Sequence, residues 1–210
     1  MFIPSAILWT IEQRDLDKTN ENIIGINSSL ILNLASLVES FNKELMNAWI
    51  KEYSKITNEN DDFLFKRLTD EFHNEIEQSE WNKQKILFTK IGDTEILNLI
   101  PEKILNEMNE LFKFRNILTH GNKLSLIEWN YGGKIKYRLE PKKFDTLYNF
   151  LNKNGIVGNL KDVKINIFES IASNDVISFF IITVNQYLEK AKESFYLPKD
   201  SNPELFKLKI

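Results

Sequence analysis

The sequence contains no cysteine and only two histidines, His73 and His120. Without cysteine, disulfides, thiolate metal sites and cysteine nucleophiles are excluded. His73 lies among carboxylates in the stretch "DEFHNEIE", where a metal site would need Asp70, Glu71 or Glu77 as further ligands. No second histidine is near it, so a solvated acidic helix face is the better interpretation. We therefore expect neither a metal ion nor a cofactor.

Long hydrophobic runs are also missing. The longest covers residues 176–184 and is enclosed by Asp175 and Asn185, whereas a membrane-spanning helix needs about 20 apolar residues. This run therefore predicts a buried core helix. The N-terminal stretch "MFIPSAILWTIEQRD" lacks a basic region and a cleavage pattern, so we expect no signal peptide, no membrane association and a cytoplasmic location.

Glycine and proline are sparse, and neither a flexible linker nor an internal repeat divides the chain. Apolar residues instead recur at intervals of three and four, the spacing of amphipathic helices. We therefore predict an all-α fold, a helical bundle with a β-hairpin insertion between its third and last major helices. The chain is interpreted as a single domain, 1–210, with an N-terminal arm at 1–27, core helices in 28–121 and 172–196, a hairpin-containing insertion at 122–171, and a tail at 198–210.

Capping residues and helix breakers set the expected helix ends. Side chains that can accept a hydrogen bond from a free backbone N–H mark the starts, and glycine marks the stops. The first helix is expected to begin at Asn27 or Ser28 and to end at the stretch "TNEND". A second helical region is expected from Asp61 or Asp62 to Gly92, with a break near Ser79. The third helix should run from Pro101 to Gly121, and the last should begin at Ser173 or Asn174.

The stretch "LSLIEWNYGGKIKYRLE" predicts two strands around Gly132 and Gly133, a two-residue hairpin loop. An exposed face with aromatic and basic residues could stack bases and hold phosphates. The simpler interpretation is that lysine and arginine stems cover the rings, and a shift of one residue in register would destroy the first interpretation. One face would carry the pairs Tyr131–Lys134, Trp129–Lys136 and Ile127–Arg138, and the other, packing inward, Leu126, Ile135, Tyr137 and Leu139.

Charge is distributed unevenly along the chain. The net charge of −3 argues against a protein that coats nucleic acid non-specifically. Residues 113–143, however, hold eight basic and two acidic residues, a net charge of +6, whereas the remaining 19 basic and 28 acidic residues carry −9. A basic segment within an acidic chain predicts a local binding site for an anion.

The stretch "ELFKFRNILTHGNK" lies in this segment and ends an apolar helical pattern with Arg115 and His120. Arginine presents a charged planar fork that suits phosphate, and histidine transfers protons near neutral pH. This pair fits the attack of an RNA 2′-hydroxyl on the adjacent phosphate, because the substrate supplies the nucleophile. On a regular helix the two side chains differ by about 140°, so a second subunit could complete the cleft.

The segment "RNILTHG" resembles the R-x4-6-H motif of HEPN domains (higher eukaryotes and prokaryotes nucleotide-binding). These are small helical bundles, many of them metal-independent endoribonucleases that act as toxins or antiviral effectors. The matching residues are Arg115, the polar Asn116 and His120. The resemblance implies that Arg115 binds the scissile phosphate, that His120 is a general base or acid, and that Asn116 orients one of them or the phosphate.

The resemblance also implies RNA as substrate, a homodimer, and an antitoxin or regulatory protein as a candidate partner. The alternatives are a non-catalytic module of the same type that binds a nucleotide or protein, and a structural helical adaptor. In a purely structural role, Arg115 would form an ion pair and His120 would cap the helix. Glu39 could face the same cleft or lie on the surface. The candidate RNA contacts are Lys113, Lys123, Trp129, Lys134, Lys136 and Arg138.

Overall fold

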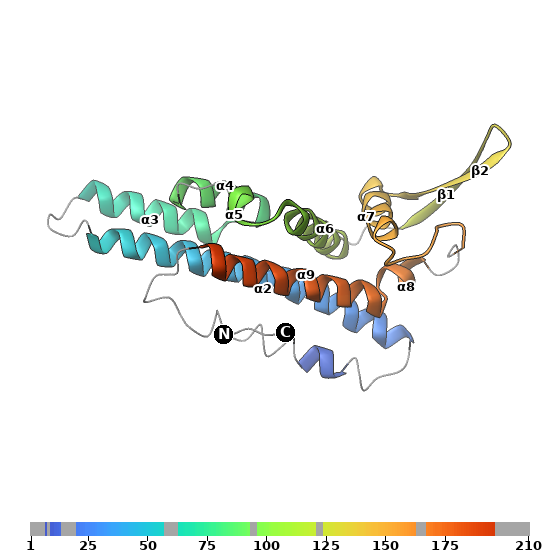
Figure 1. The fold of residues 1–210 in the computed structure, drawn as a ribbon, viewed down its shortest axis with the longest axis horizontal. Helices are drawn as coiled ribbons and strands as arrows, with labels where there is room; N and C mark the ends of the chain where they lie inside the picture. The colour runs from blue at the N-terminus through green and yellow to red at the C-terminus, as the bar shows by residue number, and fades with distance from the viewer. Residues whose placement is uncertain are drawn as a thin grey trace. The chain divides into compact units, whose positions relative to one another are not determined.

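A computed structural model describes residues 7, 9–13, 20–56, 63–92, 96–120, 124–162 and 167–195 of the chain. The described chain is mostly helical with one antiparallel two-stranded sheet, so the predicted all-α class is confirmed (Figure 1). In chain order the elements are α2 (Asn20–Ile56), α3 (Phe63–Glu77), α4 (Trp81–Gly92), α5 (Ile96–Leu99), α6 (Glu102–Thr119), β1 (Ser125–Tyr131), β2 (Lys134–Glu140), α7 (Lys142–Lys153), α8 (Ile167–Ile171) and α9 (Asn174–Ser194).

The chain forms two compact units. The first unit comprises residues 1–35, 106–184 and 210, and the second comprises residues 36–105 and 185–209. Helices α2, α6 and α9 therefore contribute residues to both units. The single domain expected over residues 1–210 stays a prediction. The candidate motif at the end of α6 and the whole hairpin belong to the first unit.

Aromatic side chains form much of the core of the second unit. The ring of Trp49 meets Phe88 edge-on at 5.5 Å between centroids and Phe195 at 5.8 Å. Phe88 and Phe195 stack on each other at 5.1 Å. Helix α4 ends at Gly92, as predicted, and a Cβ atom at this glycine would lie 3.0 Å from Cζ3 of Trp49. The absent side chain therefore leaves room for the tryptophan.

A buried polar network joins α2, α4 and α9 within the second unit. The Tyr187 hydroxyl donates to Asn42 Oδ1 at 2.8 Å, and Asn42 Nδ2 donates to Gln84 Oε1 at 3.0 Å. Gln84 Nε2 in turn donates to the backbone carbonyl of Glu39 at 3.1 Å. Burial raises the pKa of Tyr187 above its ordinary value of 10.0, because the interior disfavours the charged phenolate.

In the first unit, the apolar face of α6 packs against α9. The rings of Phe114 and Phe180 lie 6.3 Å apart. The sequence predicts an apolar stripe on this helix, formed by Ile104, Leu105, Met108, Leu111, Phe112 and Leu118. Leu118 is only half-buried. Phe114 and Ile117 lie outside that stripe, and both are buried. The buried face of α6 is therefore wider than the predicted stripe.

Asn27 does not have its predicted role as a helix cap. Helix α2 begins at Asn20, so the predicted start at Asn27 or Ser28 is wrong. The Asn27 side chain is fully buried, and its Nδ2 donates to the backbone carbonyl of Ala172 at 2.7 Å and to Asn174 Oδ1 at 3.0 Å. The amide therefore ties α2 to the beginning of α9 inside the first unit.

The remaining helix limits agree with the sequence within a few residues. Helix α2 ends before "TNEND", α3 and α4 are separate helices that meet around Ser79, and α6 begins one residue after Pro101. Ser173 caps α9 as predicted, since its Oγ accepts a hydrogen bond from the Val176 backbone N–H at 3.4 Å. Gly121, the expected terminator of α6, lies outside the described residues.

The hairpin has the predicted register. Tyr131 pairs with Lys134, Trp129 with Lys136 and Ile127 with Arg138. Gly132 and Gly133 have φ angles of 59° and 75°, which is the left-handed pair that a type I′ turn requires and that suits the twist of the flanking strands. The local signal in the sequence was therefore sufficient to set the pairing.

The second face of the hairpin is buried only at its base. Leu139 is buried, and its backbone N–H donates to Asp145 Oδ1 of α7 at 3.0 Å. Ile135, which we expected to pack inward, is 56% exposed, so that prediction is wrong for the outer half of the hairpin. Beyond the base the hairpin extends away from α7 as an arm with two exposed faces (Figure 1).

Two helical stretches among the described residues are long and apolar enough to cross a membrane, by length and composition alone. They cover Asn22–Tyr53 and Ile167–Ser194, and 39% and 44% of their most apolar windows are buried inside the protein. Core helices of other proteins pass the same test. The cytoplasmic location and the absence of membrane association therefore stay predictions.

Candidate functional site

Local hydrogen bonds at the end of α6 position the candidate motif. The helix continues through Thr119, and His120 follows it in a turn. The His120 backbone N–H donates to the carbonyl of Asn116 at 3.3 Å, and the Thr119 hydroxyl donates to the same carbonyl at 3.2 Å. Arg115 therefore lies near the end of the helix and His120 at its C-terminal cap, as the sequence predicted.

Arg115 and Asn116 are the two residues of the motif that contact each other through their side chains. Both side chains are half-buried beside the buried Phe114. Arg115 Nη1 donates to Asn116 Oδ1 at 3.0 Å. This hydrogen bond restricts the long arginine side chain, so the guanidinium has part of its orientation set before any ligand arrives.

His120 is exposed, whereas Arg115 and Asn116 are half-buried. In the described part of the chain, the structure brings Arg115 and Asn116 together but forms no side-chain bond from His120 to either. The rotation of about 140° between positions 115 and 120 of a helix accounts for the missing bond between Arg115 and His120. Within one chain, the arginine and the histidine therefore flank the helix end rather than form one preassembled pair.

Two buried carboxylates, which we did not predict from the sequence, lie one and two turns before the motif. Glu107 is buried and accepts a hydrogen bond from the Thr183 hydroxyl at 3.1 Å. Glu110 is also buried, its Oε1 pairs with Lys113 Nζ at 2.5 Å, and its Oε2 has no hydrogen-bond partner among the described residues. Their position within the apolar stretch of α6 was the available signal. The pairing with Glu110 also means that Lys113, a candidate RNA contact, already has an anionic partner.

The remaining candidate RNA contacts fall into two groups. Lys123 lies outside the described residues. The second group lies on one face of the hairpin, in the register that the sequence predicted, and consists of Trp129, Lys134, Lys136 and Arg138. All four are exposed. This face therefore joins the aromatic and basic residues that the sequence suggested for RNA binding.

The two candidates from the second unit have structural partners. His73 Nδ1 lies 2.8 Å from Asn47 Oδ1. One carboxylate oxygen of Glu39 accepts a hydrogen bond from the Trp81 backbone N–H at 3.3 Å, which caps the start of α4. Neither interpretation of Glu39 from the sequence included this capping role. Among the described residues, no three histidine or carboxylate side chains gather in a way that could hold a metal ion.

The chain was compared with known proteins at three levels. No family model, curated protein or solved structure matches it. The resemblance to HEPN domains therefore rests on the residues of the motif, and the roles that it implies for Arg115, Asn116 and His120 stay predictions.

Proposed function

We propose that this protein is a metal-independent endoribonuclease of the HEPN type, with the helical bundle of that family and a hairpin insertion, and that it acts as a toxin or antiviral effector. The observation that carries the proposal is the arrangement at the end of α6. A guanidinium held by Asn116 lies beside the helix end, and an exposed imidazole lies in the turn that follows. Phosphate binding and proton transfer are the two tasks that RNA cleavage without a metal requires.

In the proposed reaction, the RNA 2′-hydroxyl attacks the adjacent phosphorus and the bond to the 5′-oxygen of the next nucleotide breaks. Arg115 binds the non-bridging oxygens and stabilises the charge that develops on them. His120 accepts the 2′-hydroxyl proton or donates a proton to the leaving oxygen. The products are a 2′,3′-cyclic phosphate and a free 5′-hydroxyl. Asn116 acts as a positioning residue for Arg115.

A symmetric homodimer would supply both proton transfers. One imidazole cannot be base and acid at the same instant, whereas two copies of His120 around one cleft can divide these roles. A two-fold axis places the same surface patch on both subunits. The dimer also explains how a histidine that makes no side-chain bond to Arg115 in its own chain can act with an arginine.

The second candidate function is a non-catalytic module that binds RNA, a nucleotide or a partner protein. One observation favours it: among the described residues of a single chain, no side-chain hydrogen bond joins Arg115 and His120. If the two copies never meet in a dimer, the arginine can still bind a phosphate while proton transfer fails. Growth arrest on expression of the chain, relieved by His120→Ala, would separate the catalytic function from this alternative.

The decisive experiment incubates the purified full-length chain with total RNA, with and without excess chelator. We expect cleavage in both cases and 2′,3′-cyclic phosphate ends. A defined oligonucleotide with a 2′-deoxy sugar at the mapped cut site should resist cleavage, because it lacks the nucleophile. Arg115→Ala should be inactive, and Arg67→Ala, which removes an exposed arginine of α3, is the matched control. Cleavage of DNA, or activity that disappears with chelator, would contradict the mechanism.

A further inference from the structure

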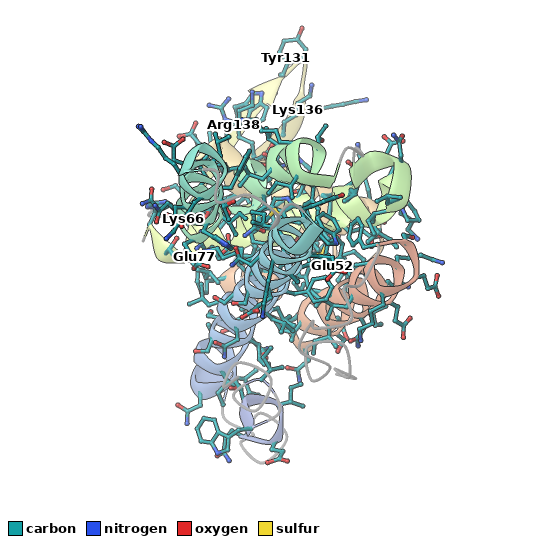
Figure 2. All side chains as sticks on the ribbon, turned by 90° about the vertical axis from the view of Figure 1, so that its left-hand side faces the viewer. Glu52, Lys66, Glu77, Tyr131, Lys136 and Arg138 are labelled. Atoms are coloured by element: carbon teal, nitrogen blue, oxygen red, sulfur yellow. The ribbon has the colours of Figure 1, made fainter. Side chains whose placement is uncertain are left out.

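The hairpin face opposite Leu139 presents two aromatic rings, each with a cation beside it. Lys136 Nζ lies 4.7 Å from the centre of the Tyr131 ring, and Arg138 Cζ lies 5.8 Å from the centre of the Trp129 ring. Both distances are in the range of cation–π interactions. Figure 2 shows Tyr131 at the far end of the hairpin, followed by Lys136 and Arg138 toward its base. The contacts thus form a ladder of alternating rings and cations.

These contacts do not cover the rings. Tyr131 is 69% exposed and Trp129 is 37% exposed. The sequence left open whether basic stems simply cover the aromatic residues, and for Tyr131 in particular the exposed fraction is too large for that interpretation. The cations restrict the conformations of the two rings and of their own side chains. A ligand therefore has fewer side chains to order, and the entropy cost of its binding is smaller.

The charge of this face selects an anion as its ligand. It carries Lys134, Lys136 and Arg138 and one carboxylate, Glu140, which pairs with Arg138 at 2.8 Å. The other carboxylate of the hairpin, Glu128, is exposed and lies on the opposite face. The face therefore has a net charge of +2, within a chain whose net charge is −3.

Ring spacing selects an unpaired strand over a duplex. Trp129 and Tyr131 are two residues apart on one strand, a separation of about 6.8 Å at the usual rise per residue. This is twice the spacing of about 3.4 Å between stacked bases along one strand. Each ring can therefore stack on its own base only if the bases are splayed apart, and the bases of a duplex already stack on each other.

We propose that the hairpin β1–β2 is an arm that binds single-stranded RNA, with Trp129 and Tyr131 stacking on bases and Lys134 and Lys136 contacting phosphates. The proposal rests on the proposed function, and it names unpaired RNA as the substrate class. Five peptide steps separate His120 from the first residue of β1, and a chain of that length spans at most about 18 Å. The base of the arm is therefore within a few nucleotides of the candidate catalytic residues.

Binding is best measured by fluorescence anisotropy with a labelled oligoribonucleotide of about 12 nucleotides, within the site sizes of single-strand-binding folds. The same sequence annealed to its complement is the duplex probe. The full-length chain carries His120→Ala in every sample, so that the probe stays intact. We expect the single strand to bind more tightly than the duplex.

The aromatic test compares Tyr131→Ala with Ile135→Ala. Both side chains are exposed near the hairpin tip, but they lie on opposite faces. Loss of one stacked base should raise the Kd of Tyr131→Ala about 5- to 150-fold, whereas Ile135→Ala should bind as before. Thermal melting checks that both variants stay folded. Equal Kd values for the two variants and the parent would overturn the proposal, as would equal affinity for single strand and duplex.

The charge test compares two double variants with the same change in net charge. Lys134→Ala with Lys136→Ala removes cations from the proposed face, and Lys142→Ala with Lys143→Ala removes two exposed lysines from the first turn of α7. For single strands each lost phosphate contact should reduce the slope of log K against log salt by about 0.7. The hairpin pair should therefore lose about 1.4 of this slope. The same loss in the α7 pair would show general charge rather than a site, and would overturn the proposal.

The outcomes of these binding experiments can be distinguished from the outcome of the cleavage test of the proposed function. If RNA is cleaved in a His120-dependent manner but Tyr131→Ala binds the strand normally, the arm is wrong and the ribonuclease stands. If no RNA is cleaved but binding depends on Tyr131, the arm stands and catalysis is wrong. If the arm instead docks a protein, no hairpin variant will change RNA binding, and the proposal is overturned.

Discussion

At the scale of single residues, His120 is the side chain on which the proposed chemistry depends most. It is exposed in the turn after α6, so replacing it should not disturb packing. We expect His120→Ala to melt like the parent chain and to lose a factor of about 10²–10⁴ in cleavage rate, the usual contribution of one general acid or base. Single-turnover cleavage assays and thermal melting measure the two quantities.

The control for this variant is His73→Ala, which removes the other histidine of the chain, in the second unit. Its contact with Asn47 can cost some stability, but cleavage by the folded protein should continue. Full ribonuclease activity in His120→Ala, or unfolding of that variant, would show that the assignment of His120 is wrong.

Tyr187 is a residue whose protonation is linked to stability. Burial raises its pKa in the folded chain above the ordinary 10.0. Above that pH the unfolded chain loses the phenolic proton while the folded chain keeps it, so the unfolded state binds fewer protons and stability falls as pH rises. We expect urea denaturation midpoints to decline above about pH 10, and to decline less in Tyr187→Phe.

Tyr187→Phe also removes the donor to the buried Asn42 Oδ1. At neutral pH the variant should therefore lose about 1–3 kcal/mol of unfolding free energy. Identical alkaline slopes in the parent and in Tyr187→Phe would contradict the linkage.

At the scale of secondary-structure elements, Asn27 tests how α2 and α9 are joined in the first unit. Its Nδ2 donates to Ala172 and Asn174, and the Asn27 side chain itself is fully buried. Asn27→Ala leaves the Ala172 carbonyl without this donor, so we expect a loss of about 1–3 kcal/mol in unfolding free energy. Asn149→Ala, at an exposed position of α7, should stay within about 0.5 kcal/mol of the parent. A parent-like midpoint for Asn27→Ala would mean that water replaces the lost hydrogen bond.

At the scale of the whole molecule, the proposed active unit is a symmetric dimer. The test mixes inactive Arg115→Ala chains with inactive His120→Ala chains. If each cleft draws residues from both subunits, mixed dimers contain one intact combination of arginine and histidine and should regain part of the activity. The control is each variant alone, at the same total protein concentration as the mixture. A monomer that cleaves RNA at the full rate would exclude the shared site while leaving the motif assignment open.

The sequence by itself determined the features that depend on near neighbours in the chain. Local hydrogen bonds and backbone preferences set the ends of α2 and α4 and the cap of α9 at Ser173. They also set the hairpin register around Gly132 and Gly133, and the position of Arg115 and His120 at the end of α6. Each of these signals acts over a few residues, so it can be read without knowing what lies across the core.

Only the tertiary structure decided the features whose partners are distant in the chain. Asn27 and Ala172 are 145 residues apart, so a residue that resembles a helix cap became a buried link inside α2. Glu107 is buried because Thr183 of α9 meets it, and Ile135 is exposed because the hairpin extends past the helix that covers Leu139. Periodicity shows that a side chain can be buried, but burial itself requires a partner surface, and the chain supplies that surface only after folding.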